Sequence, residues 1–244
     1  MSASSHRDRR RQTPEQPRAR ADRILDAASE LLARYGFDKT TLDDVARRAH
    51  VAKGTLYLHW KSKQELFATL LRRERHDLLH SVRQRAAEHA ESLGGLMRLF
   101  AEEIAARPLL KAIMLEDREI VGDMMRVKRD HPGTANAALA AAGAYIDVLI
   151  GLGLVRADLD RDDVNAVVLA ALYGYFFTPE LDGLPPLGRR AELLAETIHR
   201  TVEARPLLPA DVAKVAQATT DYLDRAVEIA RTKLEESYVH APVE

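Results

Sequence analysis

Hydrophobic residues recur three or four positions apart along almost the whole chain, which is the spacing of amphipathic α-helices. Ile24, Ala28, Leu31 and Tyr35 follow this spacing, and Gly36 supplies a C-terminal stop for the helix that they predict. No segment of strand length alternates regularly between hydrophobic and polar residues. The chain is therefore predicted to be all-α.

Glycines, prolines and short polar turns divide the rest of the pattern into further helices. A short second helix is predicted from Thr40 or Thr41 to about His50, a third over residues 52–60, and a fourth from Ser62 over many turns. The later helices are predicted at residues 93–106, 108–128, 134–152, 162–177, 189–204 and 210–236. This order places a small three-helix unit ahead of a larger helical domain.

Three regions of different character follow from these elements. Residues 1–18 have no apolar periodicity and contain two prolines and several arginines, so they are predicted to be a disordered arm. Residues 19–72 are predicted to form the three-helix unit, and residues 73–244 the larger domain. The fourth helix is long enough to link the two.

The predicted third helix is too short to be stable alone, because nucleating a helix is costly. Ala52, Leu56 and Trp60 share one side of it, which is expected to pack on the first two helices. A tight turn joins it to the short helix before it, and Val51 in that turn is expected to enter the core. Two helices joined in this way form a helix-turn-helix, whose second helix enters the major groove of DNA.

Other side chains of the third helix, and residues at neighbouring helix N-termini where backbone N–H groups favour an anion, suit contact with DNA. Lys53 can donate to guanine O6 and N7 or to a phosphate, Tyr57 can reach a phosphate, and Leu58 can contact a thymine methyl group. Gly54 allows the backbone to approach closely. The candidate DNA-contact residues are Thr40, Thr41, Lys53, Gly54, Thr55, Tyr57, Leu58, His59 and Lys63. The alternative for each candidate is that it is an ordinary surface residue with no contact to DNA.

Residues 40–66 carry a denser pattern, TTLDDVARRAHVAKGTLYLHWKSKQEL. This run resembles the DNA-binding segment of the TetR family of transcriptional regulators, whose pattern is close to T-T-x-x-x-[IV]-A-x-x-A-G-V-x-x-G-T-[LI]-Y-x-H-F-x-S-K-x-x-L. The resemblance implies a homodimeric, sequence-specific repressor that places the third helix of each subunit in the major groove of a palindromic operator. It also implies a C-terminal domain that binds a small-molecule effector and dimerises.

Four features depart from the family pattern or weaken its DNA contacts. His50 stands where the turn glycine is usual, which predicts a histidine in left-handed backbone geometry. Ala52 replaces a frequent capping serine, a loss of roughly 0.5–2 kcal/mol in helix stability, and Trp60 replaces a smaller aromatic residue. Asp43 and Asp44 lie near the predicted phosphate path, where a negative charge weakens binding.

The resemblance implies an effector pocket between about residues 76 and 210, where bulky, adaptable side chains suit an apolar ligand. The candidate ligand-contact residues are Met97, Phe100, Ile113, Met114, Met124, Tyr145, Tyr173, Phe176 and Phe177. Such residues at helical spacing are also typical of an ordinary core. Asp147, in an otherwise apolar helix, could either orient a polar group or face water.

By family position, the helices predicted at 162–177 and 189–204 are the dimer helices. A stripe of small residues permits close approach there and consists of Ala166, Ala170, Ala171 and Gly174. Packing within one chain is the alternative. The last predicted helix, at 210–236, could either extend the dimer interface or cover the core.

Composition excludes several other classes of protein. With 46% hydrophobic and 30% charged residues, the chain is typical of soluble globular proteins. It has no cysteine, which excludes disulfide scaffolds, thiol catalysis and cysteine-based zinc sites. No apolar run is long enough for a membrane span or a signal peptide, so the predicted compartment is the cytoplasm.

Charge is distributed unevenly, although the net charge is only -1. Residues 1–72 contain 15 Lys and Arg against 9 Asp and Glu, whereas the remaining residues contain 21 against 28. The basic first third and the acidic remainder imply different partners without identifying them, and a solvated, disordered tail is the alternative for the most basic part.

A helical metal-binding enzyme and a helical adaptor are the alternatives to a regulator. His76 and His80 share one helix face but have no identifiable third ligand. Glu196 with His199 forms only half of the paired motif that a di-iron bundle requires. An adaptor would bind an acidic protein or membrane surface. We therefore expect no catalysis, metal or cofactor, and the predicted partners are double-stranded DNA, a small-molecule effector and a second copy of the chain.

Overall fold

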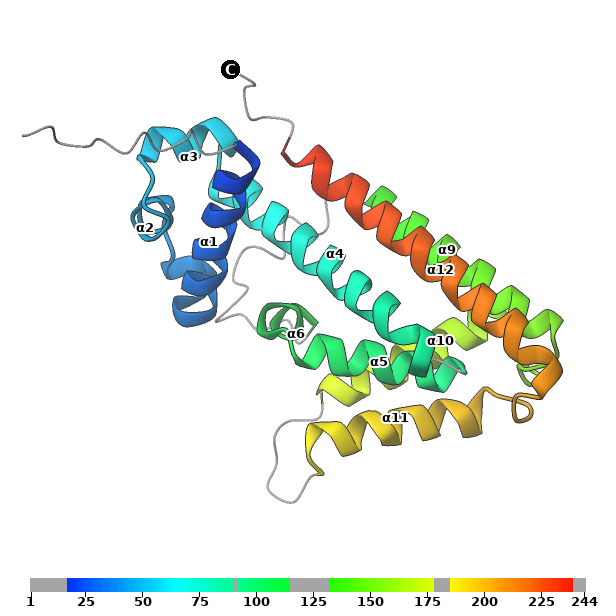
Figure 1. Cartoon of the computed structure of the whole chain (residues 1–244). Helices are drawn as coiled ribbons and strands as arrows, with labels where there is room; N and C mark the ends of the chain where they lie inside the picture. The colour runs from blue at the N-terminus through cyan, green and yellow to red at the C-terminus, as the bar shows by residue number, and fades with distance from the viewer. Residues whose placement is uncertain (1–16, 90–91, 115–131, 178–184, 239–244) are drawn as a thin grey trace, which may run out of the picture.

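A computed structural model describes residues 17–89, 92–114, 132–177 and 185–238 of the chain (Figure 1). This part of the chain is helical, apart from connecting turns and an isolated β-bridge between Val155 and Glu203. The helices are α1 (Pro17–Lys39), α2 (Leu42–Arg48), α3 (Lys53–His59), α4 (Lys63–His89), α5 (Leu93–Ala105), α6 (Pro108–Met114), α9 (Pro132–Gly151), α10 (Arg161–Phe177), α11 (Leu187–Thr201) and α12 (Pro209–Glu236). The all-α prediction is confirmed.

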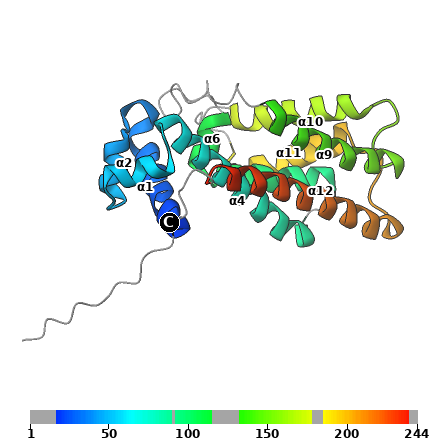
Figure 2. The same cartoon turned by 90° about the horizontal axis from the view of Figure 1, so that it is seen from above.

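The helices are arranged as a small unit at one end and a larger bundle beside it (Figures 1 and 2). Helices α1, α2 and α3 form the small unit, and α4 runs from it along the bundle. Helix α12 lies along α4 and α9, while α11 packs on α5. No helix in the described ranges is long and apolar enough to cross a membrane.

The small unit has its own hydrophobic core, which α4 and α6 complete. Ile24 and Leu25 of α1, Leu56 of α3 and Phe67 of α4 are fully buried in it. Burying an apolar side chain of this size stabilises the folded state by about 1.5–3 kcal/mol. Leu109 and Ala112 of α6 belong to the same cluster, so the bundle and the small unit share a core.

The helical backbone of α1 is interrupted at Gly36, where the sequence predicts the helix to stop. Gly36 has φ 74°, a left-handed value that interrupts the helical backbone. Phe37 then turns inward, 3% exposed, and its ring packs edge-on against Phe67 with the centroids 5.1 Å apart. This contact fixes the direction in which the chain approaches α2.

The two ends of the turn between α2 and α3 also match expectation. His50 has φ 55°, which confirms the left-handed geometry predicted at this position. Ala52 precedes α3 in an extended conformation without a side-chain hydrogen bond to the helix, so α3 begins uncapped. Its stability must come from packing.

The bundle has a second core, formed by α4, α5, α9, α10, α11 and α12. Helix α12 covers this core with the buried residues Val215, Leu223, Ala226 and Ala230, which is one of the two roles considered for the last helix. Helices α5 and α11 approach closely at Gly94, where a Cβ atom would lie 2.6 Å from the carbonyl oxygen of Ala195. Glycine is required there for steric reasons.

The first predicted region and one predicted helix are only partly described. Residues 1–16 of the predicted arm lie outside the described residues, and 17 and 18 belong to α1 instead of an arm. The helix predicted at 108–128 is described as far as Met114, and its remainder lies outside the described residues.

Candidate nucleic-acid interface

Helix α3 is anchored by one face and presents the other to solvent. Leu56 is fully buried and Trp60, just after the helix, is 2% exposed. The Nε1–H of Trp60 donates to Oγ1 of Thr69 at 2.9 Å, and the Thr69 hydroxyl donates to the carbonyl oxygen of Glu65 at 3.0 Å. The second turn of α4 therefore holds the end of α3.

The opposite face of α3 carries exposed residues of the types that contact DNA. Tyr57 is 44% exposed and Leu58 is 54% exposed. Gly54 is open, since a Cβ atom added there would meet nothing within 4 Å, and Thr55 is half-buried beside it. The face of α3 that the core does not use is therefore open to solvent.

Lys53 opens α3 and is bound to α2 by an ion pair. Its Nζ lies 2.7 Å from Oδ1 of Asp43 and 2.9 Å from Oδ2. The hydrogen bond to Asp43 raises the pKa of Lys53, so the side chain is firmly cationic. The sequence suggested only that Asp43 opposes phosphate binding, because helical periodicity does not show a contact across the turn between two helices.

Two residues predicted to contact DNA, His59 and Thr40, have buried side chains in this structure. His59 is 6% exposed and lies against Trp60, with ring centroids 5.4 Å apart. Burial, and then the charge of Arg20, lower its pKa. Thr40 is 1% exposed, and its hydroxyl donates to the carbonyl oxygen of Gly36 at 2.8 Å. Both side chains pack within the small unit, and their burial does not favour the predicted contacts.

Thr41, and not Thr40, caps α2. Its hydroxyl oxygen accepts from the backbone N–H of Asp44 at 3.2 Å, and the Asp44 carboxylate accepts from the backbone N–H of Thr41 at 3.1 Å. Hydrogen bonds from Thr41 and Arg47 lower the pKa of Asp44. A carboxylate thus already occupies the N-terminus of α2, which disfavours a phosphate there.

Lys63 stands at the start of α4 with its stem against the small unit. Its Nζ is 4.1 Å from the centroid of the Phe37 ring and 3.5 Å from the carbonyl oxygen of Asp38. Burial lowers its pKa. Ser62 caps α4, because its hydroxyl oxygen accepts from the N–H of Glu65 at 3.1 Å. The Glu65 carboxylate in turn accepts from the N–H of Lys61 at 2.8 Å.

The candidate ligand residues of the bundle separate into three groups. Met97, Phe100 and Tyr145 lie together in the second core, whereas Tyr173 is 42% exposed on α10. Tyr145 stacks on Tyr222, and burial raises the pKa of Tyr145 to about 12. Met124 lies outside the described residues. The remaining candidates lie in described helices, but their side chains are not described: Ile113, Met114, Phe176 and Phe177.

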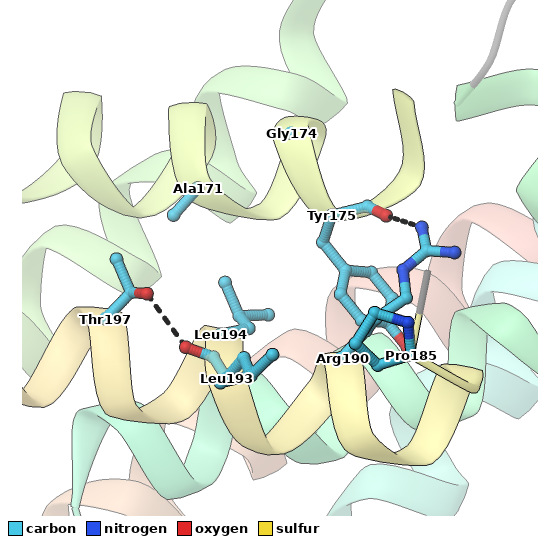
Figure 3. Close-up of a pocket in the computed structure, with 8 residues that line it drawn as sticks. All are labelled: Ala171, Gly174, Tyr175, Pro185, Arg190, Leu193, Leu194 and Thr197. Carbon is cyan, nitrogen blue, oxygen red and sulfur yellow. Dashed lines mark hydrogen bonds between the residues drawn. The ribbon is translucent and has the colours of Figure 1, made fainter. Parts of the chain in front are cut away.

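Helices α10 and α11 present an apolar groove of about 300 Å³ (Figure 3). Ala171 and Gly174 form one wall, and Leu193, Leu194 and Thr197 form the other. Arg190 lies at one end, where its guanidinium donates to the carbonyl oxygen of Tyr175.

Exposed hydrophobic side chains adjoin this groove. Leu169 is 50% exposed and Leu193 is 41% exposed. Of the predicted small-residue stripe, Ala166, Ala170 and Gly174 are also exposed, while Ala171 is half-buried. Most of the stripe is therefore exposed to solvent.

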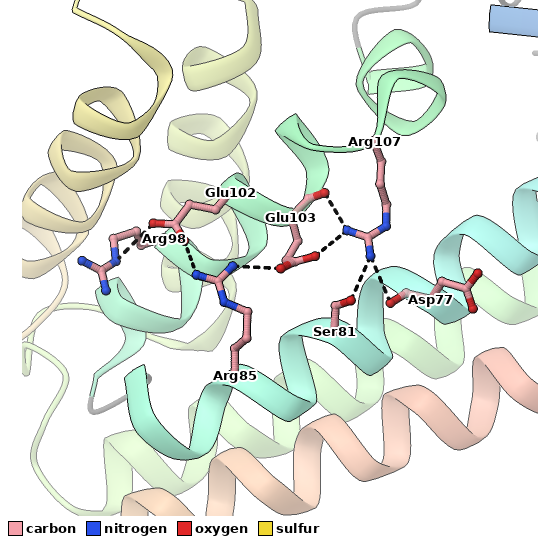
Figure 4. Close-up of polar contacts among 7 residues, drawn as sticks. All are labelled: Asp77, Ser81, Arg85, Arg98, Glu102, Glu103 and Arg107. Atoms are coloured by element: carbon pink, nitrogen blue, oxygen red, sulfur yellow. Dashed lines mark hydrogen bonds and ion pairs between the residues drawn. The ribbon is translucent and has the colours of Figure 1, made fainter.

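A chain of charged groups joins α4 to α5 (Figure 4). Arg85 of α4 pairs with Glu102 at 2.5 Å and with Glu103 at 2.8 Å. Arg107, which follows α5, pairs with Glu103 and donates to Oγ of Ser81 at 2.9 Å. These contacts hold the corner between α5 and α6 on α4, next to the core that α6 shares with the small unit.

The residues considered for a metal site have other partners. In the described ranges no group of three or more His, Cys, Asp or Glu residues is placed to hold a metal ion. His76 contacts Asp77 at 3.0 Å and His80 contacts Gln84 at 2.9 Å. His199, four residues before Glu203, contacts that carboxylate at 2.8 Å.

The fold and this surface define a helix-turn-helix DNA-binding protein. Residues 24–70 match the family model described as "Bacterial regulatory proteins, tetR family". The chain is 30% identical over 160 residues to the HTH-type transcriptional repressor KstR2 of Mycolicibacterium smegmatis, across 62% of this chain and 74% of that protein. It is 28% identical over 166 residues to the DNA-binding transcriptional repressor TetR of Mycobacteroides abscessus, across 63% and 80%.

Solved structures share the fold. A transcriptional regulator from Streptomyces coelicolor, SCO4942, aligns with a TM-score of 0.57 at 22% identity, over 76% of this chain and 98% of that one. SmeT, the repressor of the Stenotrophomonas maltophilia multidrug efflux pump SmeDEF, aligns with a TM-score of 0.53 at 23% identity, over 81% and 98%. The chain belongs to the TetR family of bacterial transcriptional regulators.

Proposed function

We propose that this regulator is a ligand-responsive repressor that binds a palindromic operator as a homodimer through α3. The observation that carries the proposal is the division of α3 into two faces. One face is buried through Leu56 and Trp60, and the other exposes Tyr57 and Leu58 beside the open backbone of Gly54. A short helix anchored in this way can enter the major groove with its free face toward the bases.

Each remaining candidate has a role that its position supports. Lys53 and Leu58 contact base edges, and Tyr57 and Lys63 contact phosphates on either side of the groove. Thr55, half-buried, contacts a base edge or phosphate close to the helix. Thr41 acts through the cap that orients α2, since its hydroxyl is already bonded to Asp44.

The dimer forms through α10 and α11. Supporting this are the exposed side chains Leu169, Tyr173 and Leu193, the groove between the two helices, and the small residues that allow a second pair of helices to approach. A two-fold related copy would place the same groove opposite itself, as an isologous interface requires. Two copies of α3 can then occupy successive major grooves.

The effector binds within the bundle and changes the spacing of the two α3 helices. The core shared by α6 with the small unit, and the charged contacts that hold the α5–α6 corner on α4, supply a physical connection between the two parts. A ligand that binds one arrangement more tightly shifts the population toward it.

Selection of a DNA site from a random duplex library tests operator binding. The protein should enrich a palindromic site, and footprinting should protect it on both half-sites. Tyr57→Ala and Lys63→Ala should each weaken binding to it about tenfold, since each removes a phosphate contact. Tyr35→Ala, which removes a tyrosine 47% exposed on α1, is the control and should bind as the wild type does. Equal affinity for every duplex, or undiminished binding by both variants, would overturn the proposal.

Sedimentation of Leu193→Glu tests the dimer. A glutamate charge at this position would be buried in the proposed interface, so the variant should be a monomer. Operator binding should weaken strongly, because each half-site is then bound independently. Val212→Glu places the same charge at a position 47% exposed on α12 and should leave the dimer intact. A dimeric Leu193→Glu variant would exclude this interface.

Operator affinity measured with a panel of small apolar and cationic ligands tests the response to an effector. At least one ligand should weaken operator binding at saturation. Unchanged affinity under every saturating ligand would contradict a ligand-responsive repressor while leaving the operator itself established.

A further inference from the structure

The ion pair between Asp43 and Lys53 bridges the two helices of the helix-turn-helix on the side of the exposed α3 residues. Asp43 lies in the first turn of α2, and Lys53 is the first residue of α3. Both side chains are more than half exposed, and Nζ of Lys53 is 6.0 Å from the centroid of the Tyr57 ring. The pair therefore lies at the proposed DNA surface, where it can contact DNA while intact.

An exposed ion pair of this kind contributes little to folding, because water screens both charges. Its effect on DNA binding is larger. The carboxylate neutralises the ammonium and repels phosphates, so Lys53 adds little to the sequence-independent attraction between a basic surface and the DNA backbone. The same carboxylate limits the directions in which the flexible lysine side chain can point.

The pair also presents a defined set of hydrogen-bonding groups to the bases. An ammonium has three N–H donors, and those not used by Asp43 can donate to guanine O6 or N7. Asp43 itself needs no contact with a base in this arrangement, because its carboxylate is occupied by the lysine.

We propose that Asp43 is a specificity-determining positioning residue that holds Lys53 toward base edges and away from phosphates, and so trades affinity for selectivity at a G·C pair of the operator. This inference rests on the proposed operator binding through α3. It gives the acidic residue a function in DNA recognition, whereas charge alone suggests only that it weakens binding.

The test compares Asp43→Asn with Glu30→Gln. Glu30 pairs with Arg48 at 2.5 Å, with side chains about as exposed as those of Asp43 and Lys53. Each variant removes one negative charge from an exposed pair of the small unit, so their net charges are equal. The affinity of each protein is measured across a range of salt concentrations for a site selected by the wild-type protein and for a scrambled duplex of equal composition.

Asp43→Asn should bind the scrambled duplex more tightly, with the salt slope steeper by about one, because the released lysine gains a phosphate contact. The ratio of operator affinity to scrambled affinity should fall about tenfold, within the range that one good base contact provides. Glu30→Gln should change both affinities by the same factor. The inference is overturned if the ratio of operator to scrambled affinity for Asp43→Asn stays within about twofold of the same ratio for Glu30→Gln.

A double-mutant cycle with Lys53→Gln separates positioning from a general effect of Asp43 on the fold. In the Lys53→Gln background, Asp43→Asn should leave the selectivity ratio unchanged, since there is no ammonium left to position. If Asp43→Asn lowers the selectivity ratio as much in the Lys53→Gln background as in the wild type, the mechanism is contradicted. Wild-type protein with no preference between the two duplexes would instead overturn the proposed function, so the two failures are distinguishable.

Discussion

At the residue scale, the turn between α2 and α3 depends on a histidine with left-handed backbone geometry. His50 has φ 55°, and its N–H donates to the carbonyl oxygen of Arg47 at 3.2 Å. Histidine tolerates this region better than most residues, and glycine enters it without steric cost. We expect His50→Gly to change the free energy of unfolding by less than about 1 kcal/mol, and His50→Val to lower it by about 1–2 kcal/mol.

Urea unfolding of the two variants measures this difference. The comparison is informative because both replacements remove the same imidazole, and only the backbone preference separates them. Equal stability of His50→Gly and His50→Val would show that the backbone at this turn relaxes out of the left-handed region when valine is present.

Individual side chains were predictable where one local rule decides their position. Gly36, His50 and the uncapped start at Ala52 follow from backbone and capping rules that act within a few residues. The burial of His59 and Thr40 was not predicted, because it depends on tertiary contacts: His59 packs against Trp60, and Thr40 bonds back to the end of α1 at Gly36. For His59 a signal was present, since it lies three residues after the buried Leu56 and so near the same helix face.

At the element scale, the contact between α5 and α11 requires a glycine. Gly94 is the second residue of α5, and a Cβ atom there would lie 2.6 Å from the backbone oxygen of Ala195, which cannot move without shifting α11. We expect Gly94→Ala to lower the free energy of unfolding by about 1–3 kcal/mol through overpacking, even though alanine is the better helix former.

Gly188 provides the matched control for this substitution. It is the second residue of α11, and a Cβ atom there would meet nothing within 4 Å. Gly188→Ala should therefore be neutral or stabilise the protein by up to about 1 kcal/mol. Calorimetric unfolding of both variants checks the pair, and a Gly94→Ala protein as stable as Gly188→Ala would mean that the two helices are not held at this distance.

The elements themselves were largely predictable, but their partners were not. Periodicity with glycine and proline boundaries predicts α5, α9, α10 and α12 to within a few residues of their observed ends. The helix predicted at 189–204 ends earlier, at Thr201, because the next residues leave the helix to pair with residues 154–156: the N–H of Arg156 donates to Val202 and the N–H of Ala204 to Leu154. Such pairing depends on residues far apart in the sequence.

At the scale of the whole molecule, α12 connects the far end of the bundle to the small unit. Its packing on α4 and α9 could not be predicted, because an amphipathic helix suits a partner chain as well as its own core. The end of this helix meets α1 and α4. The Oη–H of Tyr238 donates to Oδ1 of Asp22 at 2.8 Å, and Nη1 of Arg72 donates to Oγ of Ser237 at 2.7 Å.

This junction makes the stability of α1 depend on a residue more than two hundred positions away. Tyr238→Phe keeps the ring beneath the guanidinium of Arg18, whose Cζ is 3.5 Å from the ring centroid, and removes only the hydroxyl. A hydrogen bond to a charged group contributes about 1.5–3 kcal/mol, and partial solvent access reduces this value, so we expect a loss of about 1 kcal/mol and a Tm lower by about 2–4 °C.

Hydrogen exchange distinguishes a local effect of this substitution from a general one. Amides at the N-terminal end of α1 should exchange faster in Tyr238→Phe, because Asp22 loses the contact that ties this segment to α12, whereas amides of α5 and α11 should be protected as in the wild type. Tyr35→Phe removes a hydroxyl from a side chain that is 47% exposed on the same helix and should change neither Tm nor exchange. Faster exchange throughout the protein, or no change in the exchange rates of α1, would contradict a specific junction. A local change confined to α1 would mean that the segment after α12 stabilises α1, the helix whose buried residues share a core with Leu56 of α3.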